Sequence, residues 1–71
     1  MNFILTIDND VTVHFTRFSF KRAFKDAKEY LQQDKGLPFG ATCADFYVTP
    51  VSPAEPLADA LAKAIFIKHL V

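Results

Sequence analysis

The chain has little of what covalent cross-linking, metal binding and cofactor chemistry require. It contains one cysteine, Cys43, so it can form neither an internal disulfide nor a multi-cysteine metal site, and it suits a reducing cytoplasm. Its two histidines, His14 and His69, stand in no paired metal-ligand spacing. The two glycines, Gly36 and Gly40, belong to no phosphate-binding pattern. No metal and no cofactor is therefore expected.

Net charge and long apolar runs are also lacking. Eight basic residues balance eight acidic ones, so no global field draws the protein to nucleic acid or to an anionic membrane. The densest apolar segment, residues 57–67, is interrupted by Asp59 and Lys63 and falls short of the roughly 20 residues of a membrane span. The first eight residues lack the basic region and the longer apolar stretch of a secretory signal. We expect a cytoplasmic protein without a membrane partner.

Apolar residues, in contrast, are abundant. A 71-residue chain buries only a little over roughly 60% of the surface that its unfolded form exposes. Eight phenylalanines and a hydrophobic fraction of 51% compensate, because aromatic rings bury large areas at low entropy cost. The length predicts a single small α+β domain that spans residues 1–71.

Alternation of apolar and polar residues predicts a β-hairpin at residues 2–7 and 11–16. Its loop is expected to be Asp8-Asn9-Asp10, because an odd loop length lets both apolar sets face one core. The expected pairs are Ile7 with Val11, Leu5 with Val13 and Phe3 with Phe15. A left-handed conformation is expected at Asn9 or Asp10. The opposite face is expected to meet water, and it carries Asn2, Ile4, Thr6, Thr12, His14 and Thr16.

An amphipathic helix is predicted from Ser19 to Gln33, with Ser19 as the N-cap and Gly36 turning the chain beyond it. A third strand is predicted at residues 41–49, with Phe46 and Val48 facing the helix. A right-handed crossover through the helix places this strand beside the first one, which predicts an antiparallel sheet of order 2-1-3.

The C-terminal third leaves two points open. A second helix begins either at a capping box, Ser52-Pro53-Ala54-Glu55, or with Pro56 in its first turn. Residues 65–71 either continue that helix, with an apolar patch at Phe66 and Leu70, or form a short fourth edge strand. The absence of a turn residue before Ile65 favours the helix.

The expected fold is thus α+β, with ββαβα topology and both helices packed on one face of a three-stranded sheet. This order in so short a chain resembles small phage and mobile-element proteins, including anti-CRISPR inhibitors. The resemblance is architectural and no motif accompanies it.

One group of side chains contains the residue types of a cysteine-based catalytic site. His14, Cys43 and Asp45 are expected on the open sheet face, where they would supply a base, a thiol and an orienting acid. Their spacing carries no family signature, and we expect the protein not to be an enzyme.

The exposed side of the long helix divides into two flanks. Lys21, Lys25 and Lys28 form an uncompensated flank, whereas Arg22 and Asp26 can neutralise each other at i, i+4 spacing on the second. Lys21 and Arg22 lie in the first turn, where positive charge opposes the helix dipole without a visible structural benefit. The uncompensated flank is either a binding patch or a solvated helix face that keeps the protein soluble.

The leading hypothesis is a non-catalytic protein-binding module or inhibitor that occludes a surface of a larger protein or complex. Its expected contact residues are Arg17, Lys21, Lys25, Lys28, Leu37, Phe39, Phe66 and Leu70. For Leu37 and Phe39 the alternative, which the sequence favours, is that they fold back over the end of the core. One alternative function is a weak nucleic-acid binder that uses the basic residues among the expected contact residues, although only Tyr47 offers a stacking ring on the open sheet face. The other is an accessory protein that forms a homodimer through its C-terminal segment.

Overall fold

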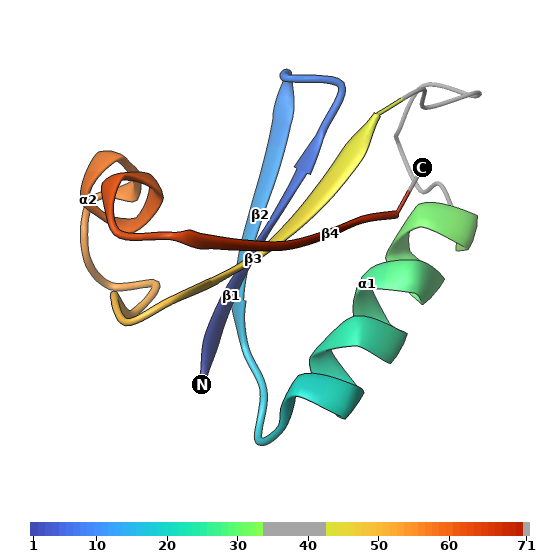
Figure 1. Ribbon diagram of the computed structural model, residues 1–71, viewed down its shortest axis with the longest axis horizontal. Helices are drawn as coiled ribbons and strands as arrows, with labels where there is room; N and C mark the ends of the chain where they lie inside the picture. The colour runs from blue at the N-terminus through green and yellow to red at the C-terminus, as the bar shows by residue number, and fades with distance from the viewer. Residues whose placement is uncertain (34–42, 71) are drawn as a thin grey trace.

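The computed structural model describes residues 1–33 and 43–70. These form a four-stranded antiparallel sheet of order β2-β1-β3-β4 and two helices (Figure 1). The predicted order of the first three strands is confirmed. No helix in these residues is long and apolar enough to cross a membrane. The elements are β1 (Asn2–Ile7), β2 (Val11–Thr16), α1 (Phe20–Gln33), β3 (Ala44–Thr49), α2 (Leu57–Ala62) and β4 (Ile65–His69).

The hairpin of β1 and β2 has the predicted register, in which Phe3 opposes Phe15 and Ile7 opposes Val11. The left-handed conformation expected at Asn9 or Asp10 occurs at Asn9, with φ 57°. Asp8 is a second such residue, with φ 51°, which was not predicted. The backbone N–H of Asp10 donates to the carbonyl of Ile7 at 3.0 Å and closes a four-residue turn. Asp8 and Asn9 are its two central residues, where a hairpin turn of this kind requires positive φ.

Helix α1 covers one face of the sheet, as its apolar stripe predicts. Ala23 and Ala27 are fully buried against the strands, and their small side chains let the helix approach closely. Phe46 of β3 is at the centre of the aromatic cluster, with its ring centroid 5.4 Å from that of Phe3. The backbone N–H of Arg22 donates to Ser19 Oγ at 3.2 Å, so the predicted N-cap is confirmed.

The helices do not pack on one face, as was predicted, but on opposite sides of β1 and β2 (Figure 1). Residues 49–62 cover the face that was expected to meet water. Ile4 on that face is fully buried, and His14 Nε2 lies 3.1 Å from the Val51 carbonyl. Thr49 Oγ1 donates to the carbonyl of Ala60 at 3.0 Å and attaches α2 to the end of β3. The part of this face that residues 49–62 cover is therefore a second, smaller core.

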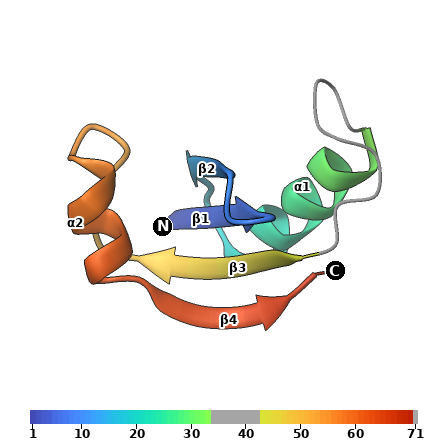
Figure 2. The ribbon, with the colours of Figure 1, turned by 90° about the horizontal axis from the view of Figure 1, so that it is seen from above.

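The preference for a continued helix at residues 65–71 was wrong, and the edge-strand alternative describes Ile65–His69. Helix α2 begins after Pro56, its N-cap residue, and not at the capping box. It ends at Ala62, and β4 then runs along the free edge of β3 (Figure 2). Strand pairing overrides the missing turn residue, because β3 offers an unpaired edge to a segment rich in β-branched and aromatic residues.

The expected patch of Phe66 with Leu70 does not form, because strand geometry separates the two residues. Phe66 opposes Tyr47 and faces away from α1. Leu70 packs against the main core, and its backbone N–H donates to the Ala44 carbonyl at 2.7 Å. A register shift between Phe46 and Tyr47 marks a bulge in this strand pair.

Candidate binding surface

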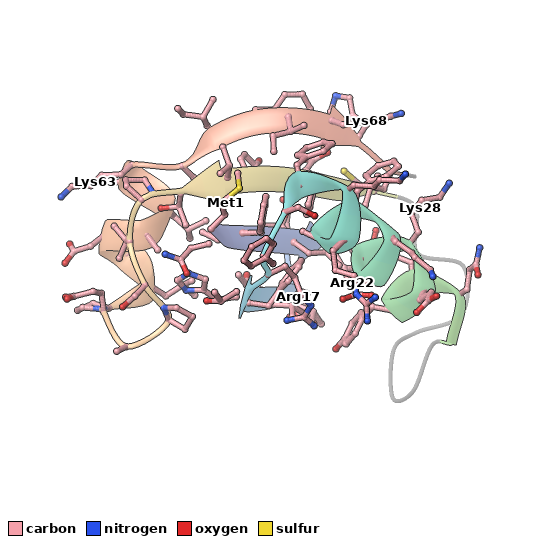
Figure 3. All side chains as sticks on the ribbon, turned by 90° about the horizontal axis from the view of Figure 1, so that it is seen from below. Met1, Arg17, Arg22, Lys28, Lys63 and Lys68 are labelled. Atoms are coloured by element: carbon pink, nitrogen blue, oxygen red, sulfur yellow. The ribbon has the colours of Figure 1, made fainter. Side chains whose placement is uncertain are left out.

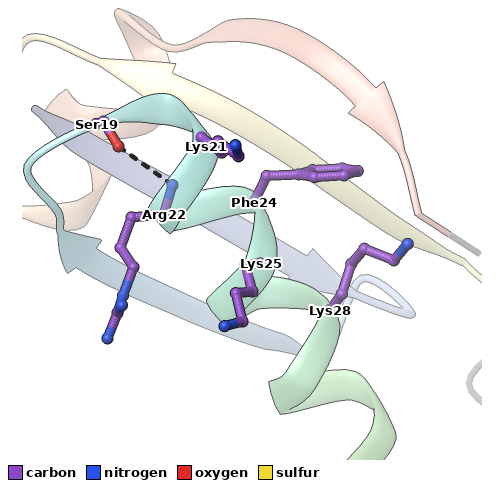
Figure 4. Close-up of a pocket in the computed structure, with 6 residues that line it drawn as sticks. All are labelled: Ser19, Lys21, Arg22, Phe24, Lys25 and Lys28. Carbon is purple, nitrogen blue, oxygen red and sulfur yellow. Dashed lines mark hydrogen bonds between the residues drawn. The ribbon is translucent and has the colours of Figure 1, made fainter.

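A groove runs along the exposed side of α1 and is lined mainly by basic side chains (Figure 4). Lys21, Lys25 and Lys28 recur there at intervals of four and three residues, which places them on one side of the helix. The predicted lysine flank is thus a continuous feature of the surface. Phe24 lies among the three lysines and supplies the apolar part of the groove.

A fourth lysine reaches the same ring from the sheet. Lys68 Nζ of β4 lies 5.1 Å from the centroid of the Phe24 ring, and Lys28 Nζ lies 5.4 Å from it. Both ammonium groups are at cation–π distance, and Figure 3 shows them on the same side of the molecule. We call the surface formed by Lys21, Lys25, Lys28, Lys68 and Phe24 the lysine groove.

The lysine groove is electrostatically unbalanced. None of its four ammonium groups forms an ion pair with a residue in the described ranges 1–33 and 43–70. Helix α1 also carries no acidic residue in its first turn. The half-buried Phe24 ring packs against Phe46 of the core, at 6.1 Å between centroids, so the apolar centre of the groove is held in place.

Arg17 lies on the other flank of α1, outside the lysine groove. Its Nε lies 2.5 Å from Asp26 Oδ2, and Arg22 Nε lies 3.5 Å from the same oxygen. The hydrogen bond from Arg17 lowers the pKa of the Asp26 carboxyl, and the charge of Arg22 adds to the effect. Arg22 also lines the groove (Figure 4), but unlike the lysines it forms an ion pair, with Asp26. The predicted Arg22–Asp26 pair is present, but Arg17 is the closer partner of Asp26.

The remaining predicted contact residues do not join this surface. Leu37 and Phe39 lie outside the described residues. Leu70 is partly buried in the core, and Phe66 is 46% exposed on the opposite face of the sheet. Sequence reasoning missed Lys68, because it favoured a helix there. The β-branched and aromatic composition of residues 65–71 was the signal that would have placed Lys68 on an edge strand.

The structure does not bring His14, Cys43 and Asp45 together as a base, a thiol and an orienting acid. His14 lies against the Val51 carbonyl. His69 of β4 takes its place beside Asp45: its Nδ1 pairs with one carboxylate oxygen, and Cys43 Sγ donates to the other at 3.9 Å. The imidazole thus contacts the carboxylate and not the sulfur.

The surroundings of Cys43 also disfavour a thiolate. Burial raises the pKa of the Cys43 thiol, and the negative charges of Asp45 and Asp8 raise it further. An activated cysteine requires the opposite, a positive environment that lowers the pKa. Within residues 1–33 and 43–70, no group of three or more histidine, cysteine or acidic side chains is arranged to hold a metal ion.

A second exposed cluster lies on the sheet face opposite α1. The Phe66 ring makes an edge contact with Tyr47 at 5.6 Å, and the imidazole of His69 lies 4.7 Å from Phe66. These rings therefore face away from the lysine groove, although Phe66 and Lys68 belong to the same strand.

No protein-family model, no curated protein and no solved structure matches this chain.

Proposed function

We propose that this protein is a non-catalytic binding module that captures an acidic surface of a larger protein through its lysine groove. The observation that carries the proposal is a groove lined by three lysines of α1, in which the half-buried Phe24 ring lies at cation–π distance from Lys28 and from Lys68 of β4. None of these lysines forms an ion pair with a described residue. Binding surfaces commonly combine an apolar centre with charged groups around it. The groove has both parts: Phe24 of α1 is the apolar centre, and the charged groups are lysines of α1 and β4.

The spacing of the lysines supports this proposal energetically. Lys21 and Lys25 are four residues apart and Lys25 and Lys28 three, so each pair repels by about 0.2–0.5 kcal/mol. The positive charge of Lys21, in the first turn of α1, also opposes the helix dipole. Carboxylates from a partner would relieve both effects, so association is expected to be favoured by charge and weakened by salt.

The arrangement of rings and charges favours a protein over nucleic acid. A single-strand binder places stacking rings beside its phosphate-binding cations. Here the ring pair of the sheet, the half-buried Tyr47 and the 46% exposed Phe66, lies on the opposite face of the sheet from the lysine groove. The zero net charge adds no long-range attraction to a polyanion. A single strand bound through its phosphates at the lysine groove would not place its bases on these rings.

The size of the molecule is compatible with occlusion of a partner's surface. A standard interface covers roughly 800 Å² on each partner, which is about one sixth of this protein's 4661 Å² of accessible surface. An inhibitor, including one of the anti-CRISPR kind, would use such a footprint to cover a binding site on its target.

Affinity capture from the native host with matched variants tests the proposal. Lys28→Glu removes a cation from the groove. Lys63→Glu makes the same charge change at the exposed C-cap residue of α2, at the other end of the molecule (Figure 3). We expect nuclease-treated extracts to yield a protein that the wild type and Lys63→Glu retain and that Lys28→Glu loses. Capture that is equal for both variants would refute the groove. Capture that disappears on nuclease treatment would favour the nucleic-acid alternative.

A further inference from the structure

Strand β4 is an outer strand of the sheet, and it pairs on one side only, with β3. Four of its five residues are exposed. Ile65 is 65% exposed and the side chain of His69 is 72% exposed. Nothing in the described residues covers its outer edge, so that edge presents backbone donors and acceptors to which another strand can pair.

The side chains of β4 differ sharply between its two faces. Lys68 opposes Phe46 and reaches the Phe24 ring on the α1 side, so it belongs to the lysine groove. Phe66 opposes Tyr47 on the other side, where the surface is aromatic. A strand added beside β4 would therefore pass cations on one face and exposed rings on the other.

We propose that the outer edge of β4 binds an extended acidic segment of the partner protein as a fifth strand of the sheet. Main-chain hydrogen bonds would supply affinity, and alternate side chains would supply specificity. The preferred segment alternates carboxylates, which face Lys68 and Lys28, with apolar residues, which face Phe66. This inference rests on the proposed function for the charge of the partner, and adds the mode of binding.

A second copy of the chain fits this edge less well. Strand β4 carries Lys68 and His69 and no acidic residue, so self-pairing would bring the lysine grooves of two copies together. Like charges on neighbouring strands destabilise the pair. A lysine on an edge strand is a common protection against self-association, and here it also selects for a partner strand of opposite charge.

The other outer strand, β2, offers no such complementarity. The cation at its end is Arg17, and this guanidinium is already paired with Asp26. Lys68 belongs to β4 itself, and Lys28 reaches the same Phe24 ring as Lys68. An acidic strand is therefore expected to select β4 over β2.

The test uses the full-length protein and a short synthetic peptide with glutamate at alternate positions and isoleucine or threonine between. Binding is measured by fluorescence anisotropy, and amide hydrogen exchange is followed by NMR. We expect exchange of the outward-facing β4 amides to slow about tenfold or more when peptide is bound, with β2 unchanged. N-methylation of the peptide on alternate residues removes the donors that face β4, and it should weaken binding by about tenfold or more.

Charge variants separate this inference from the proposed function. We expect Lys68→Glu to weaken peptide binding by roughly fivefold or more, while Lys63→Glu leaves it unchanged. If lysine variants weaken binding but N-methylation does not, strand addition is wrong and the charged groove remains. If N-methylation weakens binding but the lysine variants do not, the acidic specificity and the proposed function are both wrong.

The remaining outcomes also contradict the inference. Absence of peptide binding at low salt, or protection that appears on β2, would overturn it. Protection of β4 in the protein alone, together with a dimer in sedimentation, would identify a second copy as the occupant. Because N-methylation alters only the peptide, this arm does not depend on whether a protein variant folds.

Discussion

Truncation of Ile4 to alanine should destabilise the protein strongly, because Ile4 is fully buried beneath residues 49–62. Removal of its outer carbons loses apolar burial and leaves a cavity, for which Ile→Ala typically costs about 2–5 kcal/mol. A 71-residue domain has roughly 4–10 kcal/mol of total stability. The variant should therefore lose a large part of its free energy of unfolding.

The matched control is Ile65→Ala on β4, where the same chemical change occurs at a side chain that is 65% exposed. We expect it to cost less than about 1 kcal/mol. Ile4→Val, at about 0.5–1.5 kcal/mol, keeps the test usable if the alanine variant does not fold.

Urea unfolding monitored by circular dichroism measures all three variants, and equal m-values would show that the midpoints report stability alone. Similar losses for Ile4→Ala and Ile65→Ala would refute the reasoning. In that case α2 and the segment before it would not cover this face, and Ile4 would be in contact with water.

Three further predictions concern single side chains. Ser19→Ala should cost about 1 kcal/mol in urea unfolding, because it removes the N-cap bond to the first turn of α1; Ser52→Ala, in the unused capping box, should change little. The charged Asp26 stabilises the folded protein above its ordinary pKa of 3.8, and this contribution is lost as the pH falls through its lowered folded-state pKa. Asp26→Asn should therefore flatten the acid side of the curve of unfolding free energy against pH. An unchanged curve would contradict this. Alkylation of Cys43 at mildly alkaline pH, followed by mass spectrometry, should be slower than that of an unfolded control, and Asp45→Asn should only partly restore the rate, because burial is the larger cause of the raised pKa.

Sequence alone determined the elements that rest on local periodicity. The alternation of apolar residues, together with a three-residue loop, allowed one hairpin register, because a shift by one residue would turn the apolar side chains to the wrong face. The helix stripe and Ser19 likewise defined α1, its cap and its lysine flank. These patterns are strong because each repeats over several residues within one element.

Tertiary structure decided which face of the sheet is covered and what the C-terminal segment becomes. Burial of Ile4 depends on where α2 docks, and no pattern within residues 2–7 reports this. The segment of residues 65–69 is too short for periodicity to distinguish helix from strand, so the free edge of β3 determined the outcome. That pairing brought Lys68 to Phe24 and completed the lysine groove, because only strand geometry places this lysine on the α1 side of the sheet.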